Sequence, residues 1–395
     1  MSATSWFRPC KRGTPRQLVL VKFYVIAGES SGDAHAAVLM AEMLAMAPDI
    51  EFYGAGGPKM REVGGSHLFE WTQEAVLGFW DVLMKYPYFR TQFHRMYREI
   101  IELQPSAVIF IDYPGFNLRL ASYLQGKGFR GKKIYYISPQ VWAWNRGRIP
   151  KMSRFLDLML CIFPFEKPLY EASGLRTEFV GHPMLANLEK RRINVARDPK
   201  LVGLLPGSRE REVRRILPPM LAAASLLKQR DPEIRFEVSA ASEKMTTLIE
   251  KLVAASGFAG LPISVRNASD LMQRASVGMV ASGTATMEAS YFRFPFVLIY
   301  KVSWLTFVPG RLLVRVQHLG MPNILAGRTM IPEFIQHQAR PDAIADAVWQ
   351  LYSNESARAA MIQGMDEVIL QLSETEAGHR AAEVVLREVG VPVLK

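Results

Sequence analysis

The sequence predicts an α/β protein built from parallel sheets. Apolar runs of strand length alternate with helix-length periodic segments along nearly the whole chain. Continuous Val, Ile and Leu runs with helices between them are typical of parallel strands that are covered on both faces. Two short polar loops, at residues 28–33 and 206–210, each follow a strand-like run and open a helix-like one. These observations favour two doubly wound, Rossmann-like domains that face a central cleft.

Each strand is expected where a short apolar run lies between helix-like segments. In the first half of the chain the expected strands are residues 18–27, 50–53, 107–111, 133–137, 156–162 and 178–180. In the second half they are residues 201–205, 234–239, 263–266, 277–281 and 296–300.

The length of 395 residues favours two domains of ordinary size. The polar segment 189–200 is rich in Arg and Asn and ends in Asp198-Pro199, which makes it the best linker candidate. We therefore predict a first domain over residues 1–200 and a second over residues 201–395. The last helices are candidates to pack back on the first domain.

The composition narrows the class of protein. A net charge of +11 favours acidic partners such as nucleic acid, an anionic membrane surface or phosphorylated substrates. With only Cys10 and Cys161, a disulfide framework is not expected and a reducing compartment fits better. The histidines show no HxxxH spacing, and no stretch reaches the roughly 18–20 apolar residues of a transmembrane helix. We expect no metal site and no cofactor.

The turn at residues 206–210 is a candidate phosphate site. A strand that leads through small residues into a helix leaves backbone N–H groups unpaired at the positive end of the helix dipole. Ser208 and Arg209 lie at this helix entrance. The guanidinium of Arg209 could meet a diphosphate with two hydrogen bonds, and a solvated surface arginine is the alternative.

A second turn of this kind follows the strand expected at residues 277–281. It places Gly283 and Thr284 at the start of the next helix, with Glu288 four residues further on about the same face. A carboxylate there could accept ribose hydroxyls while the N–H groups of the turn hold a phosphate. The alternative is an acidic residue that complements the helix dipole.

Asp112 follows the strand expected at residues 107–111 and therefore lies at the carboxyl end of a buried parallel strand, where ligands bind in open α/β sheets. A carboxylate in this position could remove a proton from an attacking hydroxyl. An Asx-turn or an N-cap of the following helix is the alternative interpretation.

The segment after the strand expected at residues 133–137 carries Gln140, Trp142 and Trp144 beside basic residues. The two tryptophans could form a wall for a sugar or an acyl chain, and packing between domains is the alternative. His182, which also follows a strand, is interpreted as a hinge or core residue. Because Asp-x-Asp is absent, we expect helix N-termini and Arg209 to stabilise a leaving phosphate without a metal.

Five of these segments, together with a sixth at residues 321–328, resemble lipid-A-disaccharide synthases. They are GESSGD at 28–33, DYPGFN at 112–117, SPQVWAW at 138–144, LPGSR at 205–209, ASGTATME at 281–288 and MPNILAGR at 321–328. The resemblance covers most of the chain, and residues 1–17 lie outside it.

The resemblance implies a metal-independent, inverting GT-B glycosyltransferase. It also implies that the first domain, residues 1–200, is on the acceptor side and that the second, residues 201–395, binds the UDP-sugar. The implied reaction joins UDP-2,3-diacylglucosamine to 2,3-diacylglucosamine 1-phosphate, gives the β-1,6-linked lipid A disaccharide 1-phosphate and releases UDP. The family is also associated with a domain-swapped homodimer, for which the sequence carries no independent sign.

The resemblance also assigns roles to residues. Asp112 matches the essential acidic residue and is the candidate base, while Arg209, Glu288 and Asn323 match positions associated with UDP. Gly115 stands where many members have a second acidic residue, which bears on the hydrogen bonding around Asp112. We also predict substrate or UDP contacts for Ser208, Gly283, Thr284, Glu29, Ser31, Gly32, Gln140 and Trp142.

Both implied substrates are acylated, so the protein is expected to work at a membrane. Residues 75–89 and 304–316 combine apolar side chains with cationic flanks, which is typical of an interfacial helix on anionic lipid. We favour residues 75–89 for this contact, and a core-packed helix is the alternative. The predicted location is the cytoplasmic side of the inner membrane, with peripheral attachment.

Two rival functions use other chemistry. One is a different GT-B enzyme acting on a UDP-sugar, either a UDP-N-acetylglucosamine epimerase or a transferase with a soluble acceptor. The other is a nucleic-acid-binding protein, which only the net charge supports. No segment reads as a known nucleic-acid module, and the basic residues are scattered, so we expect no nucleic acid partner.

Overall fold

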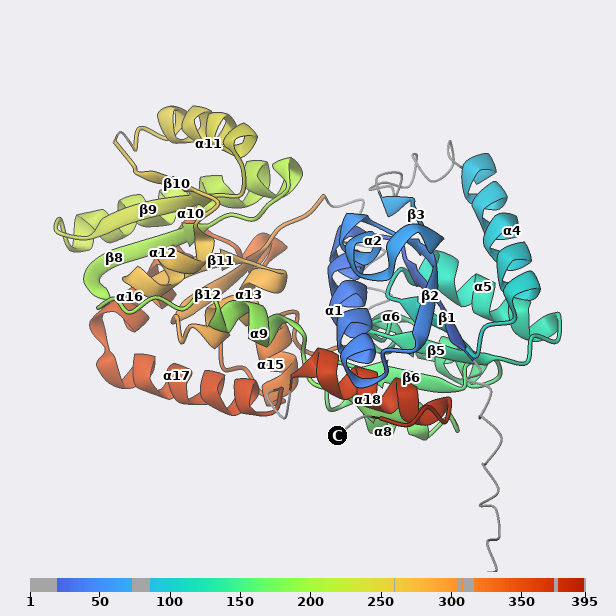
Figure 1. Cartoon of the computed structure of the whole chain (residues 1–395). Coiled ribbons are helices and arrows are strands. Elements are labelled where there is room, and N and C mark those ends of the chain that lie inside the picture. The colour runs from blue at the N-terminus through green and yellow to red at the C-terminus, as the bar shows by residue number, and fades with distance from the viewer. Residues whose placement is uncertain are drawn as a thin grey trace, which may run out of the picture.

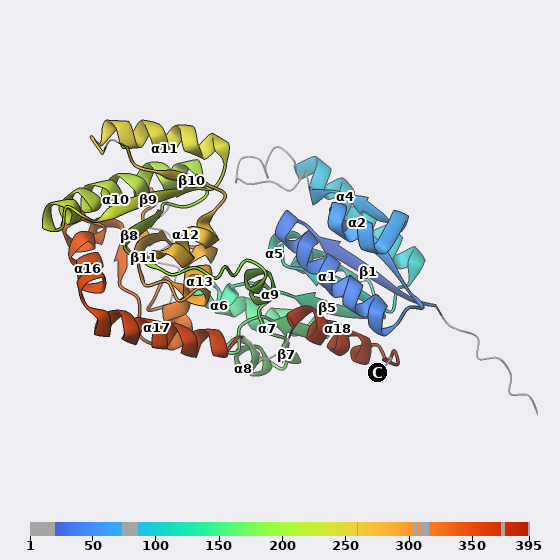
Figure 2. The ribbon, with the colours of Figure 1, turned by 60° about the vertical axis from the view of Figure 1, so that its left-hand side comes forward.

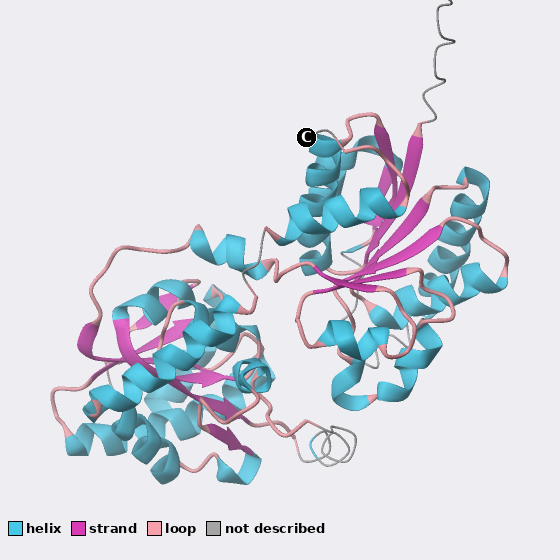
Figure 3. Cartoon of the chain, turned by 90° about the horizontal axis from the view of Figure 1, so that it is seen from below, coloured by secondary structure: helices cyan, strands magenta, loops and turns pink. Residues whose placement is uncertain are grey.

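Two parallel β-sheets form the framework of the protein in the computed structural model, which describes residues 20–72, 86–258, 260–303, 307, 316–372 and 376–393. Figure 1 shows them in two lobes, one carrying the blue to green elements and the other the green to orange ones. Figure 3 shows helices packed around the strands of both lobes. The predicted α/β class is therefore confirmed.

The first sheet has seven strands in the order β3-β2-β1-β4-β5-β6-β7, and every neighbouring pair is parallel. Its strands are β1 (Val21–Ala27), β2 (Ile50–Gly56), β3 (Leu68–Glu70), β4 (Ala107–Ile111), β5 (Lys132–Tyr136), β6 (Leu158–Cys161) and β7 (Thr177–Phe179). Phe23, Val25 and Ala27 of β1 belong to one apolar cluster, while Tyr24 and Ile26 belong to another. Because strand side chains alternate, both faces of this sheet are buried.

The helices of the first lobe connect these strands. They are α1 (Ser30–Met46), α2 (Pro58–Gly64), η1 (Gly65–His67), α4 (Tyr86–Leu103), α5 (Pro114–Gly126), α6 (Val141–Trp144), η3 (Arg146–Arg148), α7 (Ile149–Met152) and α8 (Glu166–Glu171). The next helix, α9 (Met184–Glu189), follows the last strand of this sheet, and its Leu188 is buried in the apolar cluster of the second lobe.

The second sheet has six parallel strands in the order β10-β9-β8-β11-β12-β13. They are β8 (Asp198–Leu205), β9 (Arg235–Ala240), β10 (Ile263–Val265), β11 (Ala275–Ala281), β12 (Phe296–Tyr300) and β13 (Glu333–Ile335). The helices are α10 (Glu210–Arg230), α11 (Glu243–Ala255), α12 (Ala268–Arg274), α13 (Thr284–Tyr291), α15 (Met321–Ala326), η4 (Gln336–Gln338), α16 (Pro341–Ser353) and α17 (Glu355–Leu370).

The last helix, α18 (Ala377–Glu388), returns to the first lobe and lies along α1. Figure 2 shows this red helix beside α1 and away from the sheet that precedes it in the chain. Ala381 and Val385 are fully buried in the apolar cluster of the first sheet. Glu388 forms ion pairs with Lys132 and Arg176, so charge pairing holds the far end of the helix.

All eleven predicted strands occur, with ends shifted by up to a few residues, and β3 and β13 were not predicted. Asp198 and Pro199, which the sequence placed in a linker, begin β8. The connection after α9 therefore covers residues 190–197. Of the two predicted membrane segments, residues 75–85, 304–306 and 308–315 lie outside the described residues.

Candidate functional site

Asp112 lies directly after β4, in a turn that the neighbouring strand holds in place. Its N–H donates to the Tyr136 carbonyl at 3.0 Å, and the Tyr135 hydroxyl donates to the Asp112 carbonyl at 2.6 Å. Asn117 Nδ2 donates to the same carbonyl at 2.8 Å. Asp112 and Tyr113 both have left-handed backbone angles, with φ of 43° and 49°. A left-handed backbone is unfavourable for residues with a Cβ, so this dense bonding fixes a strained turn.

The N-cap alternative for Asp112 does not hold in this structure. The N-cap of α5 is Tyr113, whose side chain makes no capping hydrogen bond. Burial, with a further contribution from the negative charge of Glu29, raises the pKa of Asp112 from 3.8 to about 6. A carboxylate with this pKa is ionised at neutral pH and is a stronger base than an exposed aspartate, as a general base needs to be.

The start of α1 lies against the end of β4, which brings the first polar loop to Asp112. A Cβ added to Gly32 would contact Ile111 at 3.7 Å, and one added to Gly28 would meet the Tyr113 ring at 2.4 Å. Glu29 is the N-cap of α1, and its side chain and that of Ser31 are exposed at this helix N-terminus. The structure therefore places Glu29, Gly32 and Asp112 at one edge of the first sheet.

Asp33, in the first turn of α1, has a structural role that the sequence reasoning missed. Its Oδ1 accepts from the N–H groups of Gly57 at 2.8 Å and Met60 at 3.0 Å, and its Oδ2 accepts from Lys59 N–H at 3.1 Å. The buried carboxylate thus caps the N-terminus of α2, where negative charge is stabilising. This bridge fixes the start of α1 against α2.

The segment after β5 carries Gln140 and Trp142 with opposite exposures. Gln140 is exposed, whereas Trp142 is 4% exposed and donates from Nε1 to Glu166 Oε1 at 2.9 Å. Glu166 Oε2 also accepts from the Phe163 N–H at 3.1 Å. Burial raises the pKa of Glu166 to about 7. Trp142 therefore packs inside the first lobe and positions this segment, and its contact with substrate stays a prediction.

Trp144, the second tryptophan, is different because it is 42% exposed. The Arg148 guanidinium lies over its ring at 5.1 Å from the centroid, a cation–π arrangement. His182 is half-buried, and its N–H donates to the Leu372 carbonyl at 3.3 Å. That bond connects the first lobe to the chain between α17 and α18.

The turn between β8 and α10 presents its polar residues to solvent. Gly207 has φ +107°, which a glycine adopts without strain, and Ser208 and Arg209 are exposed. Arg209 Nη1 lies 3.1 Å from Glu212 Oε1, and 78% of the arginine side chain is exposed. An exposed pair of this kind is weak, so the guanidinium can turn to an anionic ligand at little cost.

The turn between β11 and α13 is open in the same way. A Cβ on Gly283 would meet no atom within 4 Å, and Thr284 is exposed at the first position of α13. Since β8 and β11 are adjacent and parallel, this turn and the one carrying Arg209 share the carboxyl edge of the second sheet. Ligands bind at such edges in doubly wound sheets.

Glu288 and Asn323 are both held by protein groups. Glu288 Oε1 accepts from the Ser269 hydroxyl and lies 3.8 Å from Arg191 Nη1. The Asn323 side chain is 1% exposed. Its Oδ1 accepts from the N–H groups of Met330 and Ile331, and its Nδ2 donates to the Ile331 carbonyl and to Glu333. A direct contact of Asn323 with UDP would break these bonds, and that contact stays a prediction.

One apolar cluster includes residues beside the carboxyl edges of both sheets. Met287 of α13 belongs to the same buried cluster as Tyr136 of β5 and Ile162, which follows β6, and Met321 of α15 packs against this cluster. The helices that carry Glu288 and Asn323 therefore pack beside the strand ends of the first lobe. Within the described ranges, no group of three or more His, Cys, Asp or Glu side chains is placed to hold a metal, and no helix is long and apolar enough to cross a membrane.

Solved structures with the same architecture identify the fold. MurG from Acinetobacter baumannii matches with a TM-score of 0.57 over 93% of this chain and 99% of its own, at 14% identity. The MnaA–UDP co-structure from S. aureus matches with a TM-score of 0.61 over 94% and 98%, at 10% identity. At these identities the matches show the fold, which is the GT-B arrangement of two Rossmann-like domains.

Sequence comparison identifies the family. Residues 23–388 match the family described as lipid-A-disaccharide synthetase, and the chain belongs to it. The lipid-A-disaccharide synthase of Trichlorobacter lovleyi is 38% identical over 390 residues, covering 95% of this chain and 98% of its own. That of Geobacter sulfurreducens is 37% identical over 380 residues, covering 94% and 98%. The predicted resemblance is confirmed.

Proposed function

We propose that this protein joins two acylated glucosamines in lipid A biosynthesis. The donor is UDP-2,3-diacylglucosamine, and the acceptor is 2,3-diacylglucosamine 1-phosphate. The products are the β-1,6-linked disaccharide 1-phosphate and UDP. Family membership supports the reaction, and the half-buried Asp112, with its pKa of about 6, is the structural observation that supports its mechanism.

In the proposed mechanism Asp112 accepts the proton of the acceptor 6-hydroxyl while the oxygen attacks C1 of the donor. The bond between C1 and the diphosphate oxygen breaks, and its electron pair leaves with UDP. Because attack and departure occur on opposite sides of C1, the anomeric configuration inverts. Burial, with a smaller contribution from the charge of Glu29, raises the pKa of Asp112 to about 6, and a general base is most effective when its pKa lies near the working pH.

We assign the stabilisation of the negative charge that develops on UDP to residues at the edge of the second sheet. Gly283 and Thr284 present N–H groups at the start of α13, and Arg209 supplies an exposed guanidinium on the adjacent turn. Fixed donors of this kind stabilise a leaving phosphate. Glu288, which Ser269 orients, is assigned to the ribose hydroxyls. Asn323 acts through the segment that it holds around Glu333.

Acylated substrates place the reaction at a membrane surface. We assign the protein to the cytoplasmic face of the inner membrane, attached peripherally, with residues 75–89 as the contact segment. Liposome sedimentation of Trp80→Glu plus Leu83→Glu tests this assignment, and unchanged binding by the folded double variant would refute it. A homodimer is a further part of the proposal, which sedimentation equilibrium tests.

The acyl chains distinguish this function from its nearest rival. The purified protein is incubated with the acceptor and either UDP-2,3-diacylglucosamine or UDP-N-acetylglucosamine, and the products are weighed by mass spectrometry. We expect a disaccharide 1-phosphate only from the acylated donor. An epimerised nucleotide sugar, or equal transfer from the donor without long acyl chains, would refute the proposed substrate class.

A further inference from the structure

A groove of about 620 Å³ runs along α5 in the first lobe, separate from the predicted UDP residues of the second sheet. Its walls are α5 on one side and the segment from Arg148 to Phe155 on the other. Leu118, Met152 and Phe155 give it an apolar floor, of which Leu118 and Met152 are buried. Grooves of this size and character hold small organic ligands.

The rim of the groove is strongly basic. Arg119, Lys127, Arg148 and Lys151 line it and are exposed, and no carboxylate is among its described lining residues. Within the part of the chain that the structure describes, none of these four cations pairs with a carboxylate, while Arg148 and Lys127 lie over the rings of Trp144 and Tyr123. An apolar floor beneath unpaired cations complements an anionic amphiphile.

The groove begins beside the candidate base. Pro114 and Gly115 line one end, and they follow Asp112 and Tyr113 directly in the chain. Arg119 lies four residues after Gly115, about 6 Å further along the helix axis. Lys127 lies about 18 Å from Gly115 along the same axis. The near end of the groove therefore lies two residues along the chain from Asp112, and Arg119 lines the groove about one helical turn further on.

We propose that this groove is the acceptor subsite, and this inference rests on the proposed function. Arg119, with Arg148 and Lys151 on the facing wall, binds the 1-phosphate of the acylated sugar. One acyl chain lies on the apolar floor along α5. The 6-hydroxyl, on the opposite side of the sugar ring from the phosphate, then faces Asp112.

A flat membrane contact would use the same charge but a different shape. Membrane-bound surfaces project apolar side chains outward between cationic ones. Here the apolar residues form a recessed floor, with Leu118 and Met152 nearly inaccessible to solvent. A recessed apolar floor fits a single chain better than a bilayer surface, and contact with vesicles becomes an outcome of the test.

The test compares acceptors with and without the 1-phosphate, dispersed in detergent micelles. Arg119→Glu removes a charge-assisted contact and adds repulsion, so we expect the KM for the phosphorylated acceptor to rise roughly 10- to 100-fold. The KM for the donor is expected to stay unchanged. With 2,3-diacylglucosamine as acceptor, Arg119→Glu and the unaltered protein should have the same KM, because the phosphate is missing.

Two further variants separate charge from shape. Arg154→Glu is the matched control, since Arg154 is exposed on the same segment as Lys151 but does not line the groove. It should leave both KM values unchanged. Ser122→Trp adds bulk to the exposed lining position without changing charge, and it should lower kcat/KM for acylated acceptors with or without the phosphate.

The outcomes are distinguishable. Absence of product from the unaltered protein would refute the proposed function, whatever the variants do. Suppose that product forms but Arg119→Glu raises the KM equally for both acceptors, or that Arg154→Glu raises it as much as Arg119→Glu does. Either result would refute the assignment of the groove as the acceptor subsite. Loss of binding to anionic phosphatidylglycerol vesicles, with micellar kinetics unchanged, would assign the groove to the membrane and overturn the inference.

Discussion

Replacing Asp112 by Asn tests the base and its environment in one variant. The amide keeps the size of the side chain but cannot accept a proton from the acceptor hydroxyl. Loss of a general base lowers turnover by about 100- to 10,000-fold. UDP affinity should persist, because the residues assigned to UDP belong to the second sheet. Steady-state kinetics and isothermal titration with UDP measure the two effects.

The same variant should be more stable than the unaltered protein near neutral pH. The folded pKa of Asp112 is about 6, against an ordinary value of 3.8, so ionisation opposes folding. This difference corresponds to at most about 3 kcal/mol in the free energy of unfolding. Below about pH 4 the carboxyl is protonated in the folded and the unfolded protein, and this penalty is absent. Stability is then lost as the pH rises, and the loss is complete once the pH has passed through about 6.

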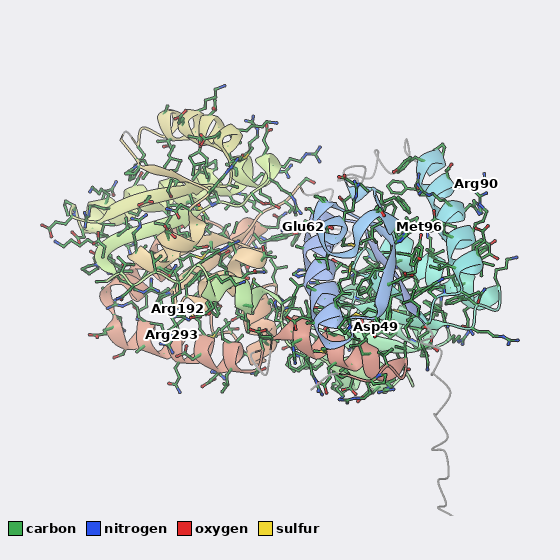
Figure 4. The ribbon with its side chains drawn as sticks, in the orientation of Figure 1. Asp49, Glu62, Arg90, Met96, Arg192 and Arg293 are labelled. Carbon is green, nitrogen blue, oxygen red and sulfur yellow. The ribbon has the colours of Figure 1, made fainter. Side chains whose placement is uncertain are left out.

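Urea unfolding at several pH values therefore gives a characteristic difference curve. The stability gain of Asp112→Asn should be near zero at pH 4 and largest above pH 7. Asp49→Asn is the control, because Asp49 is exposed in the turn between α1 and β2 (Figure 4). It should change neither turnover nor the pH dependence of stability. Near-normal turnover of Asp112→Asn, or no stability gain at pH 7.5, would refute the reasoning.

Three other substitutions test the residues around Asp112 and the residues assigned to UDP. In the unaltered protein kcat/KM should fall about tenfold per pH unit below about pH 6. Glu29→Gln should move this acidic limb of the pH profile to lower pH, because the charge of Glu29 adds to the effect of burial in raising the pKa of Asp112. An unmoved limb would exclude this coupling. Arg209→Ala should weaken UDP binding by roughly 10- to 100-fold in calorimetry, with the fold intact; unchanged affinity would remove Arg209 from the site. Asn323→Ala leaves the partly buried N–H of Met330 and the buried N–H of Ile331 without their acceptor, and should lower the free energy of unfolding by about 2–5 kcal/mol. A stable Asn323→Ala that loses only UDP affinity would restore the direct contact.

The sequence predicts the framework well because the signal for buried parallel strands is strong. Strand β4 is fully buried over all five residues, and its apolar run is unbroken in the sequence. The two strands that were not predicted, β3 and β13, have three residues each and contain Glu70 and Glu333. So short a strand at the edge of a sheet, with an acidic residue, gives no periodic pattern.

Within the site, the sequence predicts where a residue lies in the fold better than it predicts which residues it contacts. The strand before Asp112 and the loop before α1 could each be read locally, but their contact depends on the order of β1 beside β4. The partner of Trp142 is Glu166, 24 residues away, and nothing local marks that glutamate as buried. Likewise, the bonds of Asn323 are made mostly to backbone groups of a later segment, which sequence patterns do not reveal.

The central claim is that Asp112 activates a hydroxyl for direct displacement of UDP from an acylated sugar. The anomeric configuration of the new glycosidic bond, measured by the proton coupling constant in the purified disaccharide 1-phosphate, tests it most directly. A single displacement predicts the β linkage from the α-configured donor, with Asp112→Asn giving almost no product. An α linkage, or undiminished formation of product by that variant, would contradict the account.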